Sequence, residues 1–243
     1  MWGQFDEPRF HQQLRPLRQD FGSVILMAKI TALQTQKRDP NRVNVHLDGE
    51  YAFSLARIVA VWLSVGQELT DEKLASLQND DARERAYQQA LLYLGYRARS
   101  TSEIRQNLRK HEIPEEIIEE TIERLKSQKL ANDDEFAQAW VENRSTFRPR
   151  SRRALAVELR QKGVPDEAVQ SALTDVDEEA LAYEAGLKRA RRLEALEWND
   201  FRTKLSEFLA RRGFSYSVVA PIVSRIWAET HTQHHSTDNE EIG

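Results

Sequence analysis

The sequence predicts a mainly α protein, in which tandem three-helix repeats form an elongated array behind a small α+β module with a β-hairpin. Similar residues recur at intervals of about 50 along the last two thirds of the chain. Apolar residues follow helical spacing in that part, whereas alternating apolar residues are confined to the first third. The chain has 9 Gly and 7 Pro in 243 residues, too few for a loop-rich β fold.

The β-hairpin is predicted from alternation around one dipeptide. Val43, Val45 and Leu47 alternate with polar residues, as in a strand with one buried face. Asp48-Gly49 follows, and this dipeptide tolerates the positive φ of a tight hairpin turn. Alternation then resumes, so we predict two or three short strands.

The rest of the N-terminal part is predicted from composition and capping residues. Residues 1–22 are polar and are expected to form a flexible arm. The α+β module is expected at residues 23–80, with a short helix at 55–63 and another at 71–78, which Thr70 caps.

The first three-helix repeat is expected at residues 81–132. Its first helix covers 83–94, and a capping box at Ser100-Thr101-Ser102-Glu103 opens its second helix. The third helix follows Pro114, a residue that is well tolerated at a helix start. Its buried stripe is predicted to contain Ile117, Ile118, Thr121, Ile122 and Leu125.

Shifting the sequence by 51 residues places a second repeat on the first. Arg97-Ala98-Arg99-Ser100 becomes Arg148-Pro149-Arg150-Ser151. A further shift of 50 places Gly163 on Gly213. We therefore predict repeats at 133–177 and 178–229, the last being the most divergent, as is usual for an end repeat. The final segment, 230–243, is polar and acidic and is expected to be disordered.

Basic residues concentrate in the same region of each repeat, although the formal net charge of the chain is −4. Arginine pairs bidentately with phosphate or carboxylate, so repeats stacked in register would present a basic stripe to a polyanion or an acidic protein groove. The alternative is that these residues are solvated helix faces that balance nearby glutamates. Tyr96 and Phe147 precede the basic segments and join the candidates. The candidate binding residues are Tyr96, Arg97, Arg99, Arg105, Arg109, Arg144, Phe147, Arg148, Arg150, Arg152, Arg153, Arg160, Lys162, Lys188, Arg189, Arg191, Arg192, Arg211 and Arg212.

The sequence predicts no catalytic, cofactor or metal site. It has no cysteine, which excludes thiolate catalysis and cysteine-based zinc sites. The acidic clusters at Asp80-Asp81 and 132–135 suit helix capping. Three histidines, His231, His234 and His235, lie in a segment too polar to favour a metal site. With neither a membrane span nor a signal peptide evident, we expect a monomeric cytoplasmic protein that is not an enzyme.

The chain from Asn41 to about Glu229 resembles the RecX family of bacterial regulatory proteins. A Tyr-Arg-x-Arg-Ser stretch followed about 35 residues later by Asp-Asp-Glu-Phe-Ala is specific as a combination. The segments that carry the resemblance are NRVNVHLDGEYAF at 41–53, ALLYLGYRARS at 90–100, IIE at 117–119, RLK at 124–126, LANDDEFAQAW at 130–140, RRAL at 152–155 and ELRQKGV at 158–164.

The resemblance implies a curved array of three-helix repeats that lies in the groove of the RecA–DNA filament. Such a protein modulates, and usually inhibits, filament growth, strand exchange and ATP hydrolysis by RecA, and so acts in homologous recombination, DNA repair and the SOS response. The expected partner is the RecA filament, with single- or double-stranded DNA as a further partner. Two alternatives remain: a DNA-binding regulator with helix-turn-helix-like repeats, and a scaffold for another helical protein.

Overall fold

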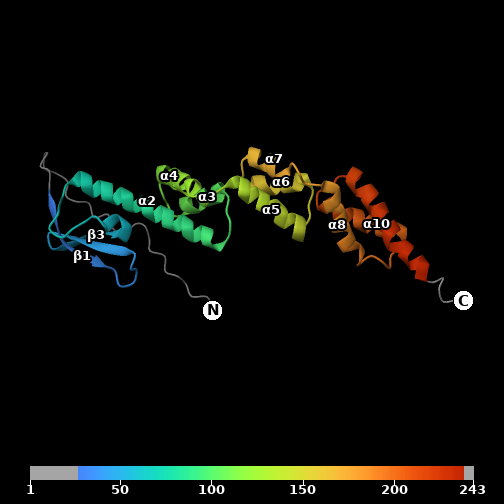
Figure 1. Ribbon diagram of the computed structural model, residues 1–243, viewed down its shortest axis with the longest axis horizontal. Coiled ribbons are helices and arrows are strands. Elements are labelled where there is room, and N and C mark those ends of the chain that lie inside the picture. The colour runs from blue at the N-terminus through green and yellow to red at the C-terminus, as the bar shows by residue number, and fades with distance from the viewer. Residues whose placement is uncertain (1–26, 238–243) are drawn as a thin grey trace. The chain divides into compact units, whose positions relative to one another are not determined.

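The computed structural model describes residues 27–237, with side chains described as far as residue 230. Within this range four strands and ten helices follow one another, so the mainly α class is confirmed (Figure 1). The chain divides into two compact units: the first contains the residues up to Arg97 together with Ile104–Gln128, and the second contains Ala98–Glu103 together with the residues from Lys129 onward. The predicted arm at 1–22 lies outside the described residues.

The N-terminal module is built on a small antiparallel sheet. Its strand order is β3-β2-β1-β4. The predicted hairpin joins β2 to β3, and Asp48 and Gly49 at its turn have positive φ angles of 51° and 91°. Ile30, Val45 and Leu55 form its buried face, with β4 as a short edge strand. The strands are β1 Ala28–Thr35, β2 Arg42–Leu47, β3 Glu50–Ala56 and β4 Glu68–Leu69.

One long helix replaces the two helices predicted at 71–78 and 83–94. Helix α2, Asp71–Tyr96, follows the short helix α1, Arg57–Ala60, and runs without interruption. The predicted break is wrong because Asp81 does not act as a cap. Its buried carboxylate accepts hydrogen bonds from the Arg42 guanidinium at 3.2 Å and from the Ala56 N–H at 2.6 Å. Asp81 therefore ties the middle of α2 to the sheet.

The second half of α2 packs against α4, Glu115–Ser127, and hydrogen bonds connect α3, Thr101–Lys110, with both helices in the first three-helix repeat. The predicted capping box is confirmed: the Ser100 hydroxyl accepts the Glu103 N–H at 3.1 Å, and the Glu103 carboxylate accepts the Ser100 N–H at 3.4 Å. In the predicted stripe of α4, Ile118, Ile122 and Leu125 are completely buried and Thr121 is buried, whereas Ile117 is only half-buried. Ile104 and Leu108 of α3 are completely buried as well.

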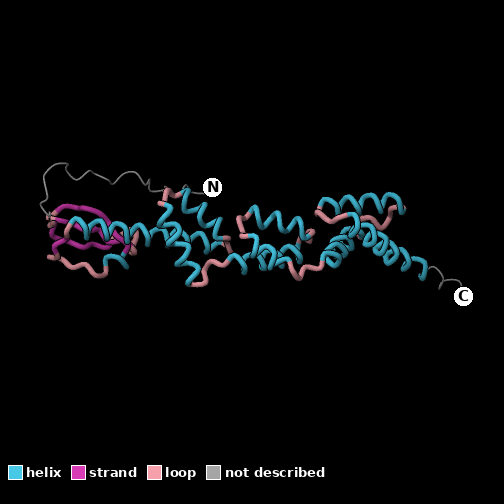
Figure 2. The backbone as a smooth tube through the Cα atoms, turned by 90° about the horizontal axis from the view of Figure 1, so that it is seen from above, coloured by secondary structure: helices cyan, strands magenta, loops and turns pink. Residues whose placement is uncertain are grey.

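The second unit contains the other two repeats. Figure 2 shows helices joined by short loops throughout this part, with strands confined to the N-terminal module. One continuous apolar core, with Leu155, Leu159, Phe201 and Leu205 fully buried, runs through both repeats. The helices are α5 Asp133–Phe147, α6 Arg152–Gln161, α7 Asp166–Leu173, α8 Glu178–Ala190, α9 Trp198–Arg211 and α10 Tyr216–Thr237.

Helix α10 extends into the segment predicted to be disordered from residue 230. It ends at Thr237, and residues 238–243 lie outside the described residues. Between Pro221 and Gly243 the sequence has neither proline nor glycine, so nothing in it stops a helix that packing has already started. None of the helices in the described part of the chain is long and apolar enough to cross a membrane.

Candidate functional site

A serine at the start of α3 connects to the turn between α6 and α7. The Ser100 hydroxyl caps its own helix and also donates a hydrogen bond to the Lys162 carbonyl at 2.5 Å. The Lys162 ammonium lies 2.8 Å from a Glu103 carboxylate oxygen. Thr101 donates from its backbone and its hydroxyl to the Asp133 carboxylate at 2.9 and 2.6 Å. We call the contacts of Ser100–Glu103 with Lys162 and Gly163 the first joint.

At the equivalent positions of the next repeat, the start of α6 contacts the turn after α9. Ser151 caps α6 by accepting the Ala154 N–H at 3.1 Å, and its own N–H donates to the Arg212 carbonyl at 3.1 Å. Arg212 Nη1 donates to the Pro149 carbonyl at 2.9 Å. We call the contacts of Pro149–Ala154 with Arg212 and Gly213 the second joint.

Glycine is required in both joints. Gly163 and Gly213 have φ angles of +70° and +92°. A Cβ at Gly163 would overlap both side-chain atoms of Ser102, and one at Gly213 would lie 2.5 Å from the Ser151 hydroxyl. The equivalent residue of the first repeat, Glu112, has a similar φ of 57° but carries a side chain. The repeated glycine therefore marks the close approach of the preceding repeat.

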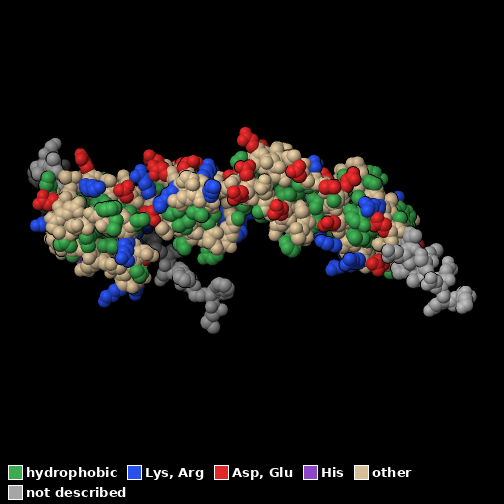
Figure 3. Space-filling model, in the orientation of Figure 1, with side chains coloured by type: hydrophobic (Ala, Val, Ile, Leu, Met, Phe, Trp, Pro, Cys, Tyr) green, Lys and Arg blue, Asp and Glu red, His purple; other side chains and the backbone are tan. Residues whose placement is uncertain are grey.

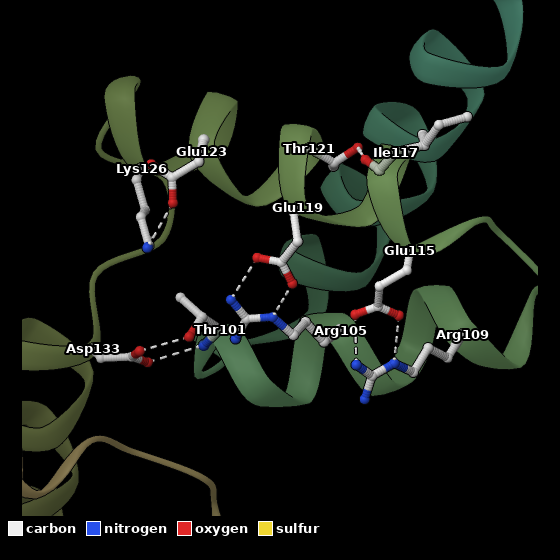
Figure 4. Close-up of polar contacts among 10 residues, drawn as sticks. All are labelled: Thr101, Arg105, Arg109, Glu115, Ile117, Glu119, Thr121, Glu123, Lys126 and Asp133. Carbon is white, nitrogen blue, oxygen red and sulfur yellow. Dashed lines mark hydrogen bonds and ion pairs between the residues drawn. The ribbon is translucent and has the colours of Figure 1, made fainter. Parts of the chain in front are cut away.

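The candidate arginines of the first repeat are paired with acids of the next helix. Arg105 contacts Glu119 through two hydrogen bonds of 2.6 and 2.9 Å, and Arg109 contacts Glu115 through two of the same lengths (Figure 4). The hydrogen bond from Arg109 lowers the pKa of Glu115, and the bond from Arg105 lowers that of Glu119. These arginines fit the alternative reading, in which basic residues balance glutamates on solvated faces.

In the second repeat, the carboxylate of Glu158 contacts three side chains. Glu158 is largely buried, and its Oε2 accepts hydrogen bonds from Trp140 Nε1 at 2.9 Å and Arg144 Nε at 2.7 Å. Its other oxygen lies 3.1 Å from Arg150 Nε. The Arg144 guanidinium also stacks over the Trp140 ring, 4.5 Å from its centroid. Glu158 thus holds two candidate arginines in position.

Three further candidates of the second repeat have partners within the fold. Arg152 donates to the backbone carbonyls of Val176 and Thr174, at the C-terminal end of α7. Arg160 lies 2.7 Å from Asp166, and Lys162 belongs to the first joint. Arg152 therefore has a structural role that its place in a basic run did not indicate.

The third-repeat candidates divide between paired and exposed residues. Lys188 reaches the Thr146 carbonyl at 3.5 Å, and Arg189 lies 5.7 Å from the centroid of the Phe208 ring. Arg211 is 3.6 Å from Glu207 in an exposed pair. Arg191 and Arg192 are exposed on the loop after α8, and within residues 27–230 no carboxylate pairs with either.

Three arginines are brought together at the second joint. Burial lowers the pKa of Arg212, and the charges of Arg150 and Arg148 lower it further. The Arg212 guanidinium lies over the Phe208 ring, 4.5 Å from its centroid. Arg148 and Arg153 are both exposed, and neither has a carboxylate partner among the residues that the structure describes. We call Arg148, Arg150 and Arg212 the second-joint arginines.

The two candidate aromatic residues are strongly exposed. Tyr96 is 85% and Phe147 73% exposed, each just before its basic segment. Tyr96 lines a shallow hollow of about 360 Å³ with residues of α2, among them Leu91 and Leu92. Arg97 is exposed at the end of α2, and Arg99 is half-buried and engaged in further contacts. On the face in Figure 3, acidic and basic side chains are intermingled over the helices.

The acidic clusters act in capping and tertiary contacts. Asn132 accepts the N–H groups of Asp134 and Glu135 at the start of α5, and Asp133 binds Thr101. Within the described residues no group of three or more histidine or acidic side chains is placed to hold a metal ion. The side chains of His231, His234 and His235 lie beyond the described ones.

Sequence reasoning did not identify the joints. It found the Ser100 capping box and the recurrence of Gly163 at Gly213, but it did not connect a serine with the glycine of the next repeat. Glu158 was missed as the partner of two arginines. The sequence did contain one indication of the joints: repeats two and three have a glycine at the position where repeat one has Glu112.

The fold and these surfaces define a helical-repeat protein with a small N-terminal sheet module, in which three arginines lie together at the second joint. Models of one family match each part in order. The chain belongs to the RecX family of regulatory proteins. The Regulatory protein RecX N-terminal domain matches residues 28–70, and the first, second and third three-helix domains of RecX match 86–125, 132–173 and 177–223. The third repeat thus differs from the other two but not from the family.

Individual relatives give the same result. The chain is 36% identical over 208 residues to Regulatory protein RecX of Bacillus subtilis, covering 82% of this chain and 78% of that protein. It is 35% identical over 199 residues to Regulatory protein RecX of Bacillus pumilus, covering 79% and 75%.

Two solved structures show the same fold. A crystal structure of regulatory protein RecX has a TM-score of 0.65 and 32% identity, covering 80% of this chain and 98% of that one. A crystal structure of RecX from Lactobacillus salivarius has a TM-score of 0.55 and 25% identity, covering 60% and 97%.

Proposed function

We propose that this protein binds the RecA recombinase filament in the cytoplasm and inhibits its ATPase, filament growth and strand exchange. Its membership of a family of regulatory proteins supports a regulatory rather than an enzymatic role. The observation that carries the proposal is the basic segment 148–153, in which the exposed residues Arg148 and Arg153 have no carboxylate partner within residues 27–230. A nucleoprotein filament offers both phosphate and acidic side chains to such a surface.

The repeat architecture supports binding to an extended partner. Three repeats offer several weak contacts to one filament, and linked contacts bind far more tightly than any of them alone. The helix-turn-helix alternative is less well supported, because α4 presents Glu115 and Glu119 where a recognition helix would meet phosphates.

The test is a titration of the DNA-dependent ATPase of RecA with the purified full chain. We expect inhibition at ratios well below one protein per recombinase monomer, because a protein bound along a filament affects more than the subunit that it touches. ATP hydrolysis that stays unchanged across a wide range of ratios would refute the proposal. The variant Gln106→Glu, at an exposed residue of α3, serves as a control and should inhibit like the wild type.

A further inference from the structure

The two joints occupy equivalent positions of successive repeats but differ in charge. Shifts of 51 and 50 residues place Ala154 on Glu103 and Arg212 on Lys162. In the first joint, Glu103 neutralises Lys162 across 2.8 Å. In the second joint the carboxylate is replaced by a methyl group, and in the described part of the chain no acid pairs with Arg212. The second joint therefore lacks the anion that completes the first.

Positive charge accumulates where that anion is missing. Arg212 binds the carbonyl of Pro149 at 2.9 Å, and Pro149 stands between Arg148 and Arg150 in the chain. Repulsion from these two residues adds to burial in lowering the pKa of Arg212. The nearby carboxylate of Glu158 contacts Arg150 but is shared with Arg144. Of the three second-joint arginines, only Arg150 therefore contacts a carboxylate, and it shares that carboxylate with Arg144.

Two neighbouring features favour an anionic ligand. The first turn of α6 contains no acidic residue, so the partial positive charge of this helix start is not offset by a carboxylate. Phe147 precedes Arg148 directly and is 73% exposed. An exposed aromatic ring beside arginines is the arrangement on which unpaired bases stack while phosphates pair with cations.

We propose that the second joint is a binding site for the phosphodiester backbone of single-stranded nucleic acid, in which one phosphate takes the place that the Glu103 carboxylate has in the first joint. The phosphate pairs with Arg212 and Arg148, and a neighbouring base stacks on Phe147. The site rests on the proposed function only in that the filament supplies the nucleic acid. Binding also links repeats two and three, because Arg212 and Arg148 come from different repeats.

The test restores the missing carboxylate. Ala154→Glu places an acid at the position that Glu103 has in the first joint, and thermal unfolding checks that the variant is folded. Binding of a fluorescein-labelled oligo-dT of 30 nucleotides is measured by anisotropy with the full chain and no recombinase. Gln106→Glu on α3 is the matched control, because it adds the same charge to an exposed site of the first repeat.

We expect Ala154→Glu to weaken oligo-dT binding by about fivefold, and to make the plot of log affinity against log salt shallower by about 0.7, the value for one phosphate contact. Gln106→Glu should stay within about twofold of the wild type. Wild-type affinity and salt dependence in a folded Ala154→Glu protein would overturn the proposal. Unchanged oligo-dT binding with weakened ATPase inhibition would also overturn it, since the ligand would then be an acid of the recombinase.

A second variant keeps the test decisive if Ala154→Glu does not fold. Arg148→Gln removes one cation from an exposed site at the end of α5, and it should weaken oligo-dT binding by a similar factor. Wild-type binding by a folded Arg148→Gln protein would overturn the proposal equally. The proposed function fails separately, when the wild-type chain leaves the RecA ATPase unchanged.

Discussion

The first and second repeats share one plan and use their arginines differently. In the first repeat, Arg105 and Arg109 each have a carboxylate of their own on α4. In the second repeat, Glu158 is shared by Arg144 and Arg150, while Arg148 lies exposed and without an acidic partner in the described range. A similar density of basic residues therefore gives a neutralised surface in one repeat and an excess of positive charge in the other.

The two repeats also differ at the turn before their third helix, and this difference should have the strongest effect on stability. Gly163→Ala would force a Cβ into Ser102 at a positive φ, which we expect to cost roughly 2–4 kcal/mol from backbone strain and overpacking. Glu112→Ala in the first repeat should cost less than about 1 kcal/mol. Urea unfolding of both variants measures this, and equal losses would show that the first joint does not depend on close approach.

Inhibition of RecA should separate the paired from the unpaired arginines. The double change Arg148→Ala and Arg153→Ala should raise the concentration needed for half inhibition about tenfold, equivalent to about 1.4 kcal/mol. Arg105→Ala with Arg109→Ala should change it by less than about twofold, because their charge is already neutralised within the chain. Equal effects of the two double variants would contradict the prediction that the second repeat contributes more to inhibition than the first. Arg152 is left intact, because its bonds to Val176 and Thr174 hold the end of α7.

Loss of the Glu158 carboxylate, which Arg144 and Arg150 share, should weaken more than one contact. Glu158→Gln removes the charge from hydrogen bonds to Arg144 and Trp140 in a largely buried setting, with an expected cost of about 1–2 kcal/mol. Glu207→Gln, in an exposed pair with Arg211 at 3.6 Å, should cost less than about 0.5 kcal/mol. Thermal unfolding of the two variants checks the contrast, and a smaller loss in Glu158→Gln would argue against its role.

Low pH should slightly lower the stability of the first repeat. Hydrogen bonds from Arg109 and Arg105 depress the pKa values of Glu115 and Glu119 in the folded state. Their stabilisation is therefore present above the unfolded pKa near 4.3 and is lost as the pH falls through the lower folded values. Both groups are exposed, so the effect is small. Glu119→Gln should flatten the fall in thermal midpoint between about pH 6 and about pH 3, and an identical fall would refute this.

Local patterns predicted the fold, because the period of apolar residues and the turn residues act over short distances. The hairpin at Asp48-Gly49, the Ser100 capping box and the buried stripe of α4 all followed in this way. The continuity of α2 could not be predicted, because the partners of Asp81 are Arg42 and Ala56, far away in the sequence.

The candidate site was predicted less completely, for the same reason. The basic residues were identified by type, but whether each arginine has an acid depends on which helices pack together. Arg105 and Glu119 lie on different helices, as do Arg144 and Glu158. The role of Arg152 depends on carbonyls after α7, which no local pattern connects with the start of α6.

The joints also determine how such an array can gain or lose units. A middle repeat carries the glycine that receives its predecessor and the serine that engages its successor, as Gly163 and Ser151 do. The first repeat has Glu112 in place of the glycine, and the third has the core residue Phe201 at the position of the serine. If the middle repeat is duplicated, each copy has both the glycine that contacts the preceding repeat and the serine that contacts the following one. A copy of the first or the third repeat lacks one of these two residues. The chain can therefore be lengthened most readily by duplication of the middle repeat, residues 133–177.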